Sequence, residues 1–362
     1  MTKEELYSMK TEAPDRDVEV LAKQRWDSLV KPIDGLGAFE EMICRIAGIQ
    51  GKTSPTLSRK GLIIMCADNG VVEEGVTQTG QSVTYDVAEM MGERRSSVGR
   101  MTMHYPLDIF PYDVGINTKD TPKGVINRKI RQGTANLLKG PAMTEQECLA
   151  AIGVGLEAVR DCHSKGYDII ATGEMGIGNT TSSAALLSAL TGEKPERFTG
   201  RGSGLPDAGL ERKKQVIRDA VRLHRGAKAG TPVKTAEETL QVLTALGGLD
   251  IAGLVGVFLG GAVCRIPIVI DGLISAVSAY TAELFLPGCR DYMIASHSGK
   301  EKGTERILTE LSLTPVLQAD MALGEGTGAV LLFPMLDMAL SLYLDGTTFQ
   351  DTDIAKYERF GK

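Results

Sequence analysis

A glycine-rich stretch between two apolar runs constrains the fold of this chain most strongly. Residues 168–172 (DIIAT) form a short β-branched run of the kind found in buried strands. The turn 173–183 (GEMGIGNTTSS) follows, and residues 184–190 (AALLSAL) are rich in helix formers. A strand, a glycine turn and a helix start leave the first helical N–H groups free, and the glycines let the backbone approach a ligand. The stretch therefore predicts a site for an anion.

Four other apolar runs predict further strands, at 61–70, 107–115, 265–272 and 292–296. Pro111 favours an edge position for the second of them. Helical patterns lie between the runs, at 84–91, 144–165, 209–225, 236–246 and 274–286. Strands that alternate with helices predict an α/β fold, in which a parallel sheet carries helices on both faces.

Polar residues end most of these runs. In a parallel sheet the carboxyl ends of the strands meet at one edge, where ligands bind. We therefore expect one region to gather the following residues: Asp68, Asn69, Asp113, Glu174, Asp271, Ser296 and His297.

Composition excludes several classes of function. The chain has 362 residues and a net charge of −6 without a basic tract, so a nucleic-acid partner is not expected. Six scattered cysteines without CxxC pairing are typical of reduced core residues in a cytoplasmic protein. With only four histidines and no His/Cys cluster, neither a metal nor another cofactor is expected. The charged N-terminus lacks a signal peptide, and polar residues or proline interrupt the apolar stretches 251–273 and 328–344, so no membrane span is expected.

Two glutamates stand between glycines. Glu174 follows Gly173 in the first turn, and Glu325 lies in the sequence 323–329 (LGEGTGA) before an apolar helical run. A carboxylate before a helix is explained equally well by helix capping. A glutamate exposed in a partly apolar cleft can instead bind substrate or remove a proton.

A second glycine-rich loop, 200–209, opens the helix that carries Lys213. Arg201 and Lys213 could place positive charge beside a phosphate, although spacing alone favours a solvated lysine at position 213. The loop follows no convincing strand, so a GxGxxG nucleotide motif is not supported. The acids of residues 68–79 lack regular metal-ligand spacing, and we expect this segment to close over a substrate.

Taken together, these motifs resemble the nicotinate-nucleotide–dimethylbenzimidazole phosphoribosyltransferase family. The resemblance runs from about residue 20 to about residue 344. The motifs that carry it are 31–37 (KPIDGLG), 66–70 (CADNG), 173–181 (GEMGIGNTT), 247–253 (GGLDIAG), 270–272 (IDG) and 323–328 (LGEGTG). It implies transfer of phosphoribose from nicotinate mononucleotide to 5,6-dimethylbenzimidazole, which gives α-ribazole 5′-phosphate and nicotinate.

The resemblance also implies an architecture. A Rossmann-like large domain is expected at 56–345, and the helical segment 1–55 and the tail 346–362 would form a small domain. A homodimer is implied as well. Glu325 would be the general base, with Glu174 and Lys213 beside it. The remaining residues expected to bind substrate are Gly176, Gly178, Asn179, Thr180, Gly202, Ser203, Gly204, Asp68, Asn69, Thr79, Val87, Asp271 and Ser296.

The chain departs from the family pattern in the region expected to hold the aromatic base. That pattern has a serine near Thr79 and a glutamine near Val87. A changed pocket predicts a wider choice of base, so the alternative is a homologue that activates a purine or a phenol. Such a homologue could act as one subunit of a heteromer.

Overall fold

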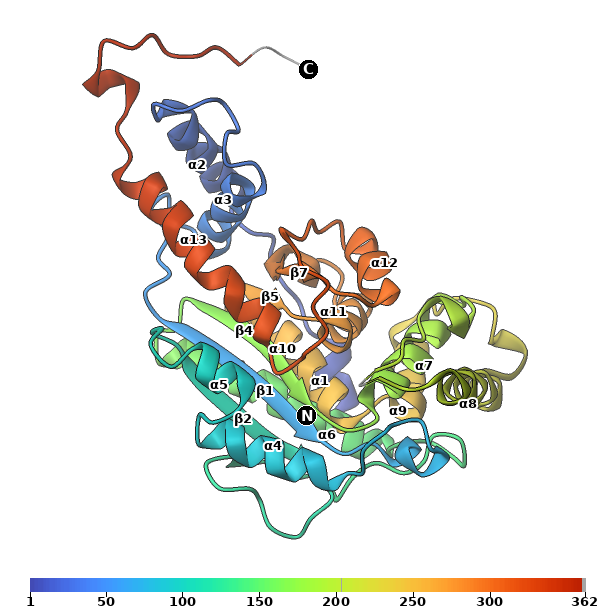
Figure 1. The fold of residues 1–362 in the computed structure, drawn as a ribbon. Helices are drawn as coiled ribbons and strands as arrows, with labels where there is room; N and C mark the ends of the chain where they lie inside the picture. Colours follow the sequence, from blue (N-terminus) through green and yellow to red (C-terminus); the bar gives the residue numbers. More distant parts are fainter. Residues whose placement is uncertain (203, 360–362) are drawn as a thin grey trace.

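Six parallel strands form the central sheet of the protein, of which the computed structural model describes residues 1–202 and 204–359. The strands are β1 (Lys60–Ala67), β2 (Asp108–Gly115), β3 (Ile126–Asn127), β4 (Ile169–Met175), β5 (Ile268–Ile270) and β6 (Met293–Ala295). Their order is β3-β2-β1-β4-β5-β6, and every neighbouring pair is parallel. This is the strand order of the Rossmann fold, so the predicted parallel sheet is confirmed (Figure 1).

Helices cover both faces of the sheet (Figure 1). One face packs against helices α6 (Glu145–Ser164), α7 (Asn179–Thr191), α8 (Asp207–Arg225), α9 (Ala236–Leu246), α10 (Leu249–Cys264), α11 (Leu273–Phe285) and α12 (Lys302–Glu310). The apolar core on the other face includes residues of α4 (Ser82–Gly92), α5 (Ser97–Met101) and α13 (Thr327–Asp345), and it extends to α2 (Arg16–Ser28) and α3 (Ala38–Gln50). The side chains of strand β1 explain why both faces are covered. Leu62 and Ile64 lie in the apolar core on one face, and Ile63 and Met65 lie in the core on the other. Burial on both faces makes the strand a continuous apolar run.

The edge position predicted for residues 107–115 is wrong, because β2 lies between β1 and β3. The edge strand β3 is only two residues long and pairs with Tyr112 and Asp113. Pro111 therefore faces β1 on one side and no strand on the other, which is why its missing N–H is tolerated.

Helix α10 is absent from the predicted helices because its sequence is apolar all round. It crosses α6 closely, and glycines make this possible. A Cβ at Gly155 would lie 1.9 Å from the carbonyl oxygen of Gly253, and a Cβ at Gly256 would lie 1.9 Å from that of Ile152. The two short strands β7 (His297–Ser298) and β8 (Leu317–Gln318) are also too brief to be read from a sequence pattern.

Helices α2 and α3 and the second half of α13 form an arm that projects from the sheet (Figure 1). Trp26 and Tyr343 pack there with ring centroids 5.1 Å apart. The C-terminal tail returns to this arm, where Val30 N–H donates to the carbonyl of Thr347 (2.9 Å). The short helix α1 (Lys3–Tyr7) instead places Leu6 in the core beside α6. The division into two domains stays a prediction.

One described helix, α13, has the length and apolar composition to cross a membrane. In this fold 56% of its apolar window is buried, and it contains Pro334 and Asp337. A core helix meets the same criteria, and the burial of Leu332, Phe333 and Leu336 against the sheet accounts for the composition of α13.

Candidate active site

A cavity of about 250 Å³ opens beyond the carboxyl ends of β4 and β5. This is the place where doubly wound sheets bind ligands. Ten of the residues predicted from the sequence line it: Val87, Glu174, Gly176, Gly178, Asn179, Thr180, Gly202, Asp271, His297 and Glu325.

Other predicted residues do not line this cavity. Thr79 is exposed, and so is Gly204. Asp68 is buried and accepts hydrogen bonds from the Thr84 hydroxyl (2.6 Å) and the Asn117 N–H (2.8 Å). The expected substrate contacts of these residues stay predictions.

Two more of these residues hold neighbouring segments together. The Asn69 Oδ1 accepts from the Ser182 hydroxyl at 2.7 Å, and the Ser296 hydroxyl donates to the carbonyl of Ile270 at 2.6 Å. Asn69 thereby ties the end of β1 to α7, and Ser296 ties the end of β6 to β5. Ser203, also predicted, lies outside the described residues.

The turn before α7 can exist only with glycine at two positions. Gly178 has φ of +98°, a region that L residues rarely enter. A Cβ at Gly176 would lie 2.3 Å from the carbonyl oxygen of Ala67 and 2.5 Å from Oδ2 of Asp250. These glycines bring the first turn of α7, with Asn179 and Thr180, to the wall of the cavity.

Lys213, on α8, reaches this first turn from behind. Its side chain is only 1% exposed, and Nζ donates to the Thr180 hydroxyl at 2.8 Å. A Cβ at Gly202 would lie 3.2 Å from that hydroxyl and 3.4 Å from Nζ, so the second glycine loop meets the same point. Burial lowers the pKa of Lys213 to about 8, against the opposing charge of Glu301. A buried ammonium beside a helix N-terminus is suited to a phosphate.

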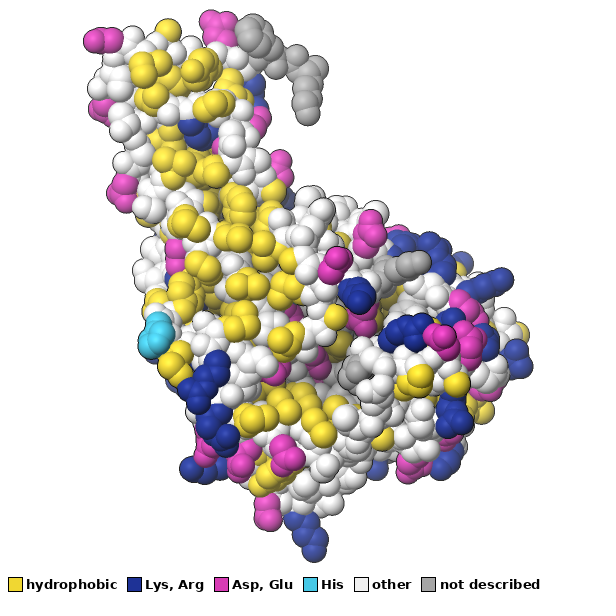
Figure 2. Space-filling model, viewed as in Figure 1, with side chains coloured by type: hydrophobic (Ala, Val, Ile, Leu, Met, Phe, Trp, Pro, Cys, Tyr) yellow, Lys and Arg dark blue, Asp and Glu magenta, His cyan; other side chains and the backbone are white. Residues whose placement is uncertain are grey.

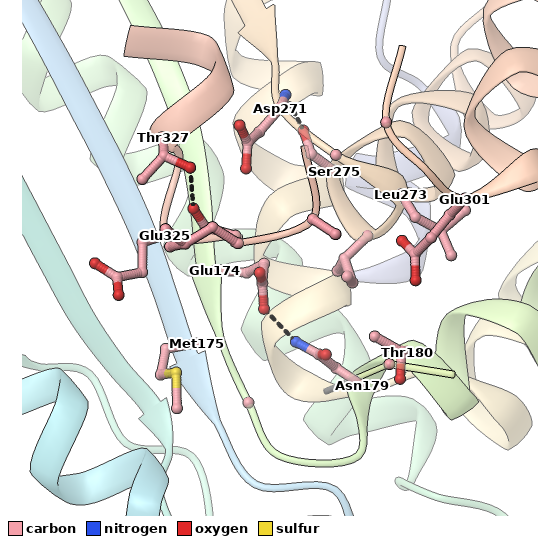
Figure 3. Close-up of a pocket in the computed structure, with 18 of the residues that line it drawn as sticks. Glu174, Met175, Asn179, Thr180, Asp271, Leu273, Ser275, Glu301, Glu325 and Thr327 are labelled. Atoms are coloured by element: carbon pink, nitrogen blue, oxygen red, sulfur yellow. Dashed lines mark hydrogen bonds between the residues drawn. The ribbon is translucent and has the colours of Figure 1, made fainter. Parts of the chain in front are cut away.

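Glu174, at the end of β4, accepts a hydrogen bond from the Asn179 amide (Figure 3). Burial raises the pKa of Glu174 to about 8, the Asn179 hydrogen bond opposes the rise, and the nearby charges of Asp250, Asp271 and Glu301 add to it. The side chain is half-buried by surface exposure and lies at the base of the cavity. A carboxylate that caps a helix accepts from backbone N–H groups, whereas Glu174 accepts from the Asn179 side chain. Helix capping therefore does not explain the presence of this glutamate.

The backbone around Glu325 packs directly against β4. A Cβ at Gly173 would lie 2.8 Å from the carbonyl oxygen of Glu325, and one at Gly324 would lie 2.6 Å from Oε1 of Glu174. Glu325 itself has φ of +60° between two glycines that also have positive φ. A non-glycine residue in this region stores strain, which is typical of functional sites.

The two glycine-flanked glutamates thus meet through their backbones, but their carboxyl groups diverge. Figure 3 shows Glu174 directed toward Asn179 and Glu325 directed to the opposite side, toward Met175. There the Val98 N–H donates to Oε2 of Glu325 at 3.0 Å, and Oε1 remains available to a ligand.

Asp271 joins the site to the start of α13. It is 4% exposed, and its Oδ1 accepts from the Ala329 N–H at 3.0 Å. Burial raises the pKa of Asp271 to about 6, opposed by the backbone N–H groups of α13.

Sequence reasoning missed several residues of the site. Glu301, Met175 and Leu323 line the cavity, and Asp250 lies beneath Asn179. Asp250 had a detectable signal, since it stands in the 247–253 motif. Glu301 had none, because it lies at the start of an unpredicted helix. The described residues contain no group of three or more His, Cys, Asp or Glu side chains placed to hold a metal.

The cavity has two chemically different ends. Thr180 and Gly202 line one end, with the buried Lys213 behind them, which suits an anion. The other end combines the carboxylate of Glu325 with apolar side chains of Val76, Val87, Met175 and Leu323, which suits a flat aromatic ring bearing an N–H group. A Rossmann-type sheet with such a site defines an enzyme that brings a phosphorylated compound and an aromatic compound together.

The comparisons with known proteins agree with this class. The family model described as "Phosphoribosyltransferase" matches residues 11–354. A nicotinate-nucleotide–dimethylbenzimidazole phosphoribosyltransferase of Clostridium acetobutylicum is 42% identical over 94% of this chain and 96% of its own length. One of Acetivibrio thermocellus is 41% identical over 93% of this chain and 94% of its own length. The crystal structure of CobT from Thermus thermophilus has a TM-score of 0.86 and 38% identity, covering 94% of this chain and 100% of the other. The chain belongs to this phosphoribosyltransferase family.

Proposed function

We propose that the protein transfers the phosphoribosyl group of nicotinate mononucleotide to 5,6-dimethylbenzimidazole. The products are α-ribazole 5′-phosphate and nicotinate. The observation that carries this proposal is the pairing, in one cavity, of an anion-binding end with an apolar end that holds the Glu325 carboxylate. The names of the relatives favour dimethylbenzimidazole over the purine or phenol of the alternative.

The nucleotide phosphate would bind where α7 begins. Gly178, Thr180 and Gly202 line this part of the cavity, and the buried Lys213 behind Thr180 would supply the positive charge. Glu174 and Asp271 would then face the ribose, between the two ends of the cavity.

Glu325 would act as the general base. A benzimidazole nitrogen is a weak nucleophile as long as its ring N–H keeps its proton while positive charge develops. Oε2 of Glu325 is held by the Val98 N–H, so Oε1 can accept that proton from a ring lying against Val87 and Met175. The other ring nitrogen attacks the anomeric carbon.

The leaving group needs no acid. Nicotinate is a cationic pyridinium in the nucleotide and takes the electron pair of the breaking C–N bond. Attack from the opposite face inverts the anomeric carbon from β to α. Correct placement of the two substrates can supply roughly 7–11 kcal/mol of the barrier.

An assay with the purified chain tests the proposal. Nicotinate release should require both nicotinate mononucleotide and dimethylbenzimidazole, and one nicotinate should appear for each base consumed. Release at the same rate without the base would show a hydrolase instead, and no release would refute the proposed reaction.

We also infer that the protein is a cytoplasmic homodimer. Along α13, exposed apolar residues fall on one helical face: Leu331 (38% exposed), Met338 (67%) and Leu342 (39%). Figure 2 shows hydrophobic side chains gathered along the arm and the adjoining body. A continuous apolar surface of this kind is typical of an interface. A second copy of the chain would cover it by two-fold symmetry.

Replacement of Met338 by glutamate tests the dimer. The Met338→Glu variant should shift from dimer to monomer in light scattering coupled to size exclusion, because a charge would be buried in the interface. Leu223→Glu is the matched control, since Leu223 is 55% exposed on α8, and it should leave the dimer intact. A monomeric wild type, or a Met338→Glu variant that dimerises as tightly, would contradict the inference.

A further inference from the structure

A half-buried and a buried carboxyl group share one amide nitrogen at the base of the cavity. The Asn179 Nδ2 donates to Oε2 of Glu174 and to Oδ2 of Asp250, the latter at 3.0 Å. Asp250 is fully buried at the start of α10, and Asn179 is 4% exposed. Asp250 thus lies behind the wall of the cavity, where it contacts Asn179 and the turn at Gly176.

This arrangement fixes how many protons the pair must hold. Both hydrogens of the amide are used, one for each carboxyl group, and Oδ1 of Asp250 has no hydrogen-bond partner among the described residues. No salt bridge within that part of the chain neutralises either acid. Two like charges held this close in a buried site disfavour each other, so one of the two acids keeps a proton.

The proton belongs on Glu174. Asp250 sits at the N-terminus of a 16-residue helix, which favours its negative charge. Glu174 lies at the end of a strand, and within the described part of the chain only the shared amide donates to it. The pKa values agree with this order, because burial raises that of Asp250 to about 6 and that of Glu174 to about 8.

We propose that Asp250 is a positioning residue that acts through Asn179 to keep Glu174 a neutral acid in the substrate-binding state. The proposal rests on the proposed function. The protonated Glu174 presents an O–H from Oε1, next to Gly324 and facing the cavity. Nicotinate mononucleotide carries a phosphate and a carboxylate, so a neutral donor binds it whereas a pair of anions would repel it. Asp250 itself touches no substrate.

Other charged groups face Glu174 from the surrounding elements. They are Asp271 after β5 and Glu301 at the start of α12, with His297 on β7 lining the same cavity, while the Glu325 carboxylate points away. Lys213 on α8 lies behind Thr180 and feels the charge of Glu301. Lys213 is the important competitor, because its pKa is also lowered to about 8. Loss of its charge at high pH would weaken phosphate binding over the same range.

The test is the pH dependence of kcat/KM for nicotinate mononucleotide. In the wild type it should fall above about pH 8. Asp250→Asn keeps an acceptor for Asn179 and removes the charge, so the pKa of Glu174 drops and the midpoint of this fall should move about one pH unit lower. Glu174→Gln, which is neutral at every pH, should make the fall shallower and leave only the part that comes from Lys213.

Glu301→Gln is the control that separates the two acids from Lys213. The charge of Glu301 raises the pKa of Lys213, so Glu301→Gln should lower it. If the loss of kcat/KM at high pH comes from Lys213, Glu301→Gln should therefore shift the midpoint further than Asp250→Asn does. A larger shift in Asp250→Asn supports the proposal. An unmoved midpoint in Asp250→Asn, or a pH profile of Glu174→Gln identical to that of the wild type, overturns it.

A spectroscopic measurement covers the case in which Asp250→Asn fails to fold. The infrared spectrum of the wild type minus that of Glu174→Gln at pH 7 should contain the C=O band of a protonated carboxyl group. Absence of that band overturns the proposal. This readout needs no turnover, so an inactive wild type would refute the proposed function without deciding the state of Glu174.

Discussion

The Glu325→Gln variant should lose activity by about 10²- to 10⁴-fold in kcat, the usual cost of removing a general base. The amide has the shape of the carboxyl group and can still accept from the Val98 N–H, so the strained loop should keep its conformation. Nicotinate mononucleotide should still bind, because its phosphate is held at the other end of the cavity. The measurements are kcat with both substrates and the Kd of the nucleotide by calorimetry.

Two outcomes would contradict this role of Glu325. Near-wild-type turnover at all pH values would mean that another group removes the proton. Loss of nucleotide affinity in proportion to kcat would mean that Glu325 supports the fold of the cavity rather than the chemistry. An unchanged thermal midpoint should accompany the loss of activity.

The Lys213→Met variant should lose about 10- to 100-fold in kcat/KM for nicotinate mononucleotide, the value of one hydrogen bond from a charged group to the phosphate. Its stability should not fall. Burial lowers the pKa of Lys213 to about 8, so below pH 8 the folded protein holds the buried charge at a cost in stability. From about pH 8 up to the higher pKa of this lysine in the unfolded chain, the free energy of unfolding therefore rises with pH. Methionine removes that cost at similar length.

Lys214→Met is the matched control for this prediction. Lys214 is the next residue of α8 and forms an ion pair with Glu211 at 2.6 Å, whereas Lys213 reaches Thr180. Its replacement should change kcat/KM less than about 2-fold, as expected for a surface ion pair. Equal losses in both variants would show that general charge, rather than the position of Lys213, attracts the nucleotide. A marked drop in the thermal midpoint of Lys213→Met would assign the lysine to the fold.

The order of apolar runs and helical patterns was enough to predict the parallel sheet. Long runs such as β1 are buried on both faces, and this leaves an unambiguous mark on the sequence. Short or unusual elements leave no such mark. Strand β3 has two residues, and α10 shows no polar face because it is enclosed between the sheet and α6. The prediction from Pro111 that its strand lies at the edge of the sheet is wrong, because the edge strand is β3, which is too short to pair with Pro111.

For the candidate site, the sequence pointed to the residues that belong to recognisable turns. Glu174 and Glu325 stood out because glycines flank them, and both line the cavity. Their opposite directions could not be predicted, because the direction depends on the left-handed backbone of Glu325. Lys213 looked like a solvated helix residue by spacing, and only its burial against Thr180 distinguishes it. The pairing of Asp250 with Asn179 joins positions 71 residues apart, which no local pattern records.

The anomeric configuration of the product tests the central claim most directly. Purified protein is incubated with nicotinate mononucleotide and dimethylbenzimidazole, and the coupling of the anomeric proton is measured by NMR. Direct attack by a base held beside Glu325 predicts the α-anomer only, in amounts equal to the nicotinate released. A β-linked product, a mixture of anomers, or free ribose 5-phosphate in place of the riboside would contradict the account.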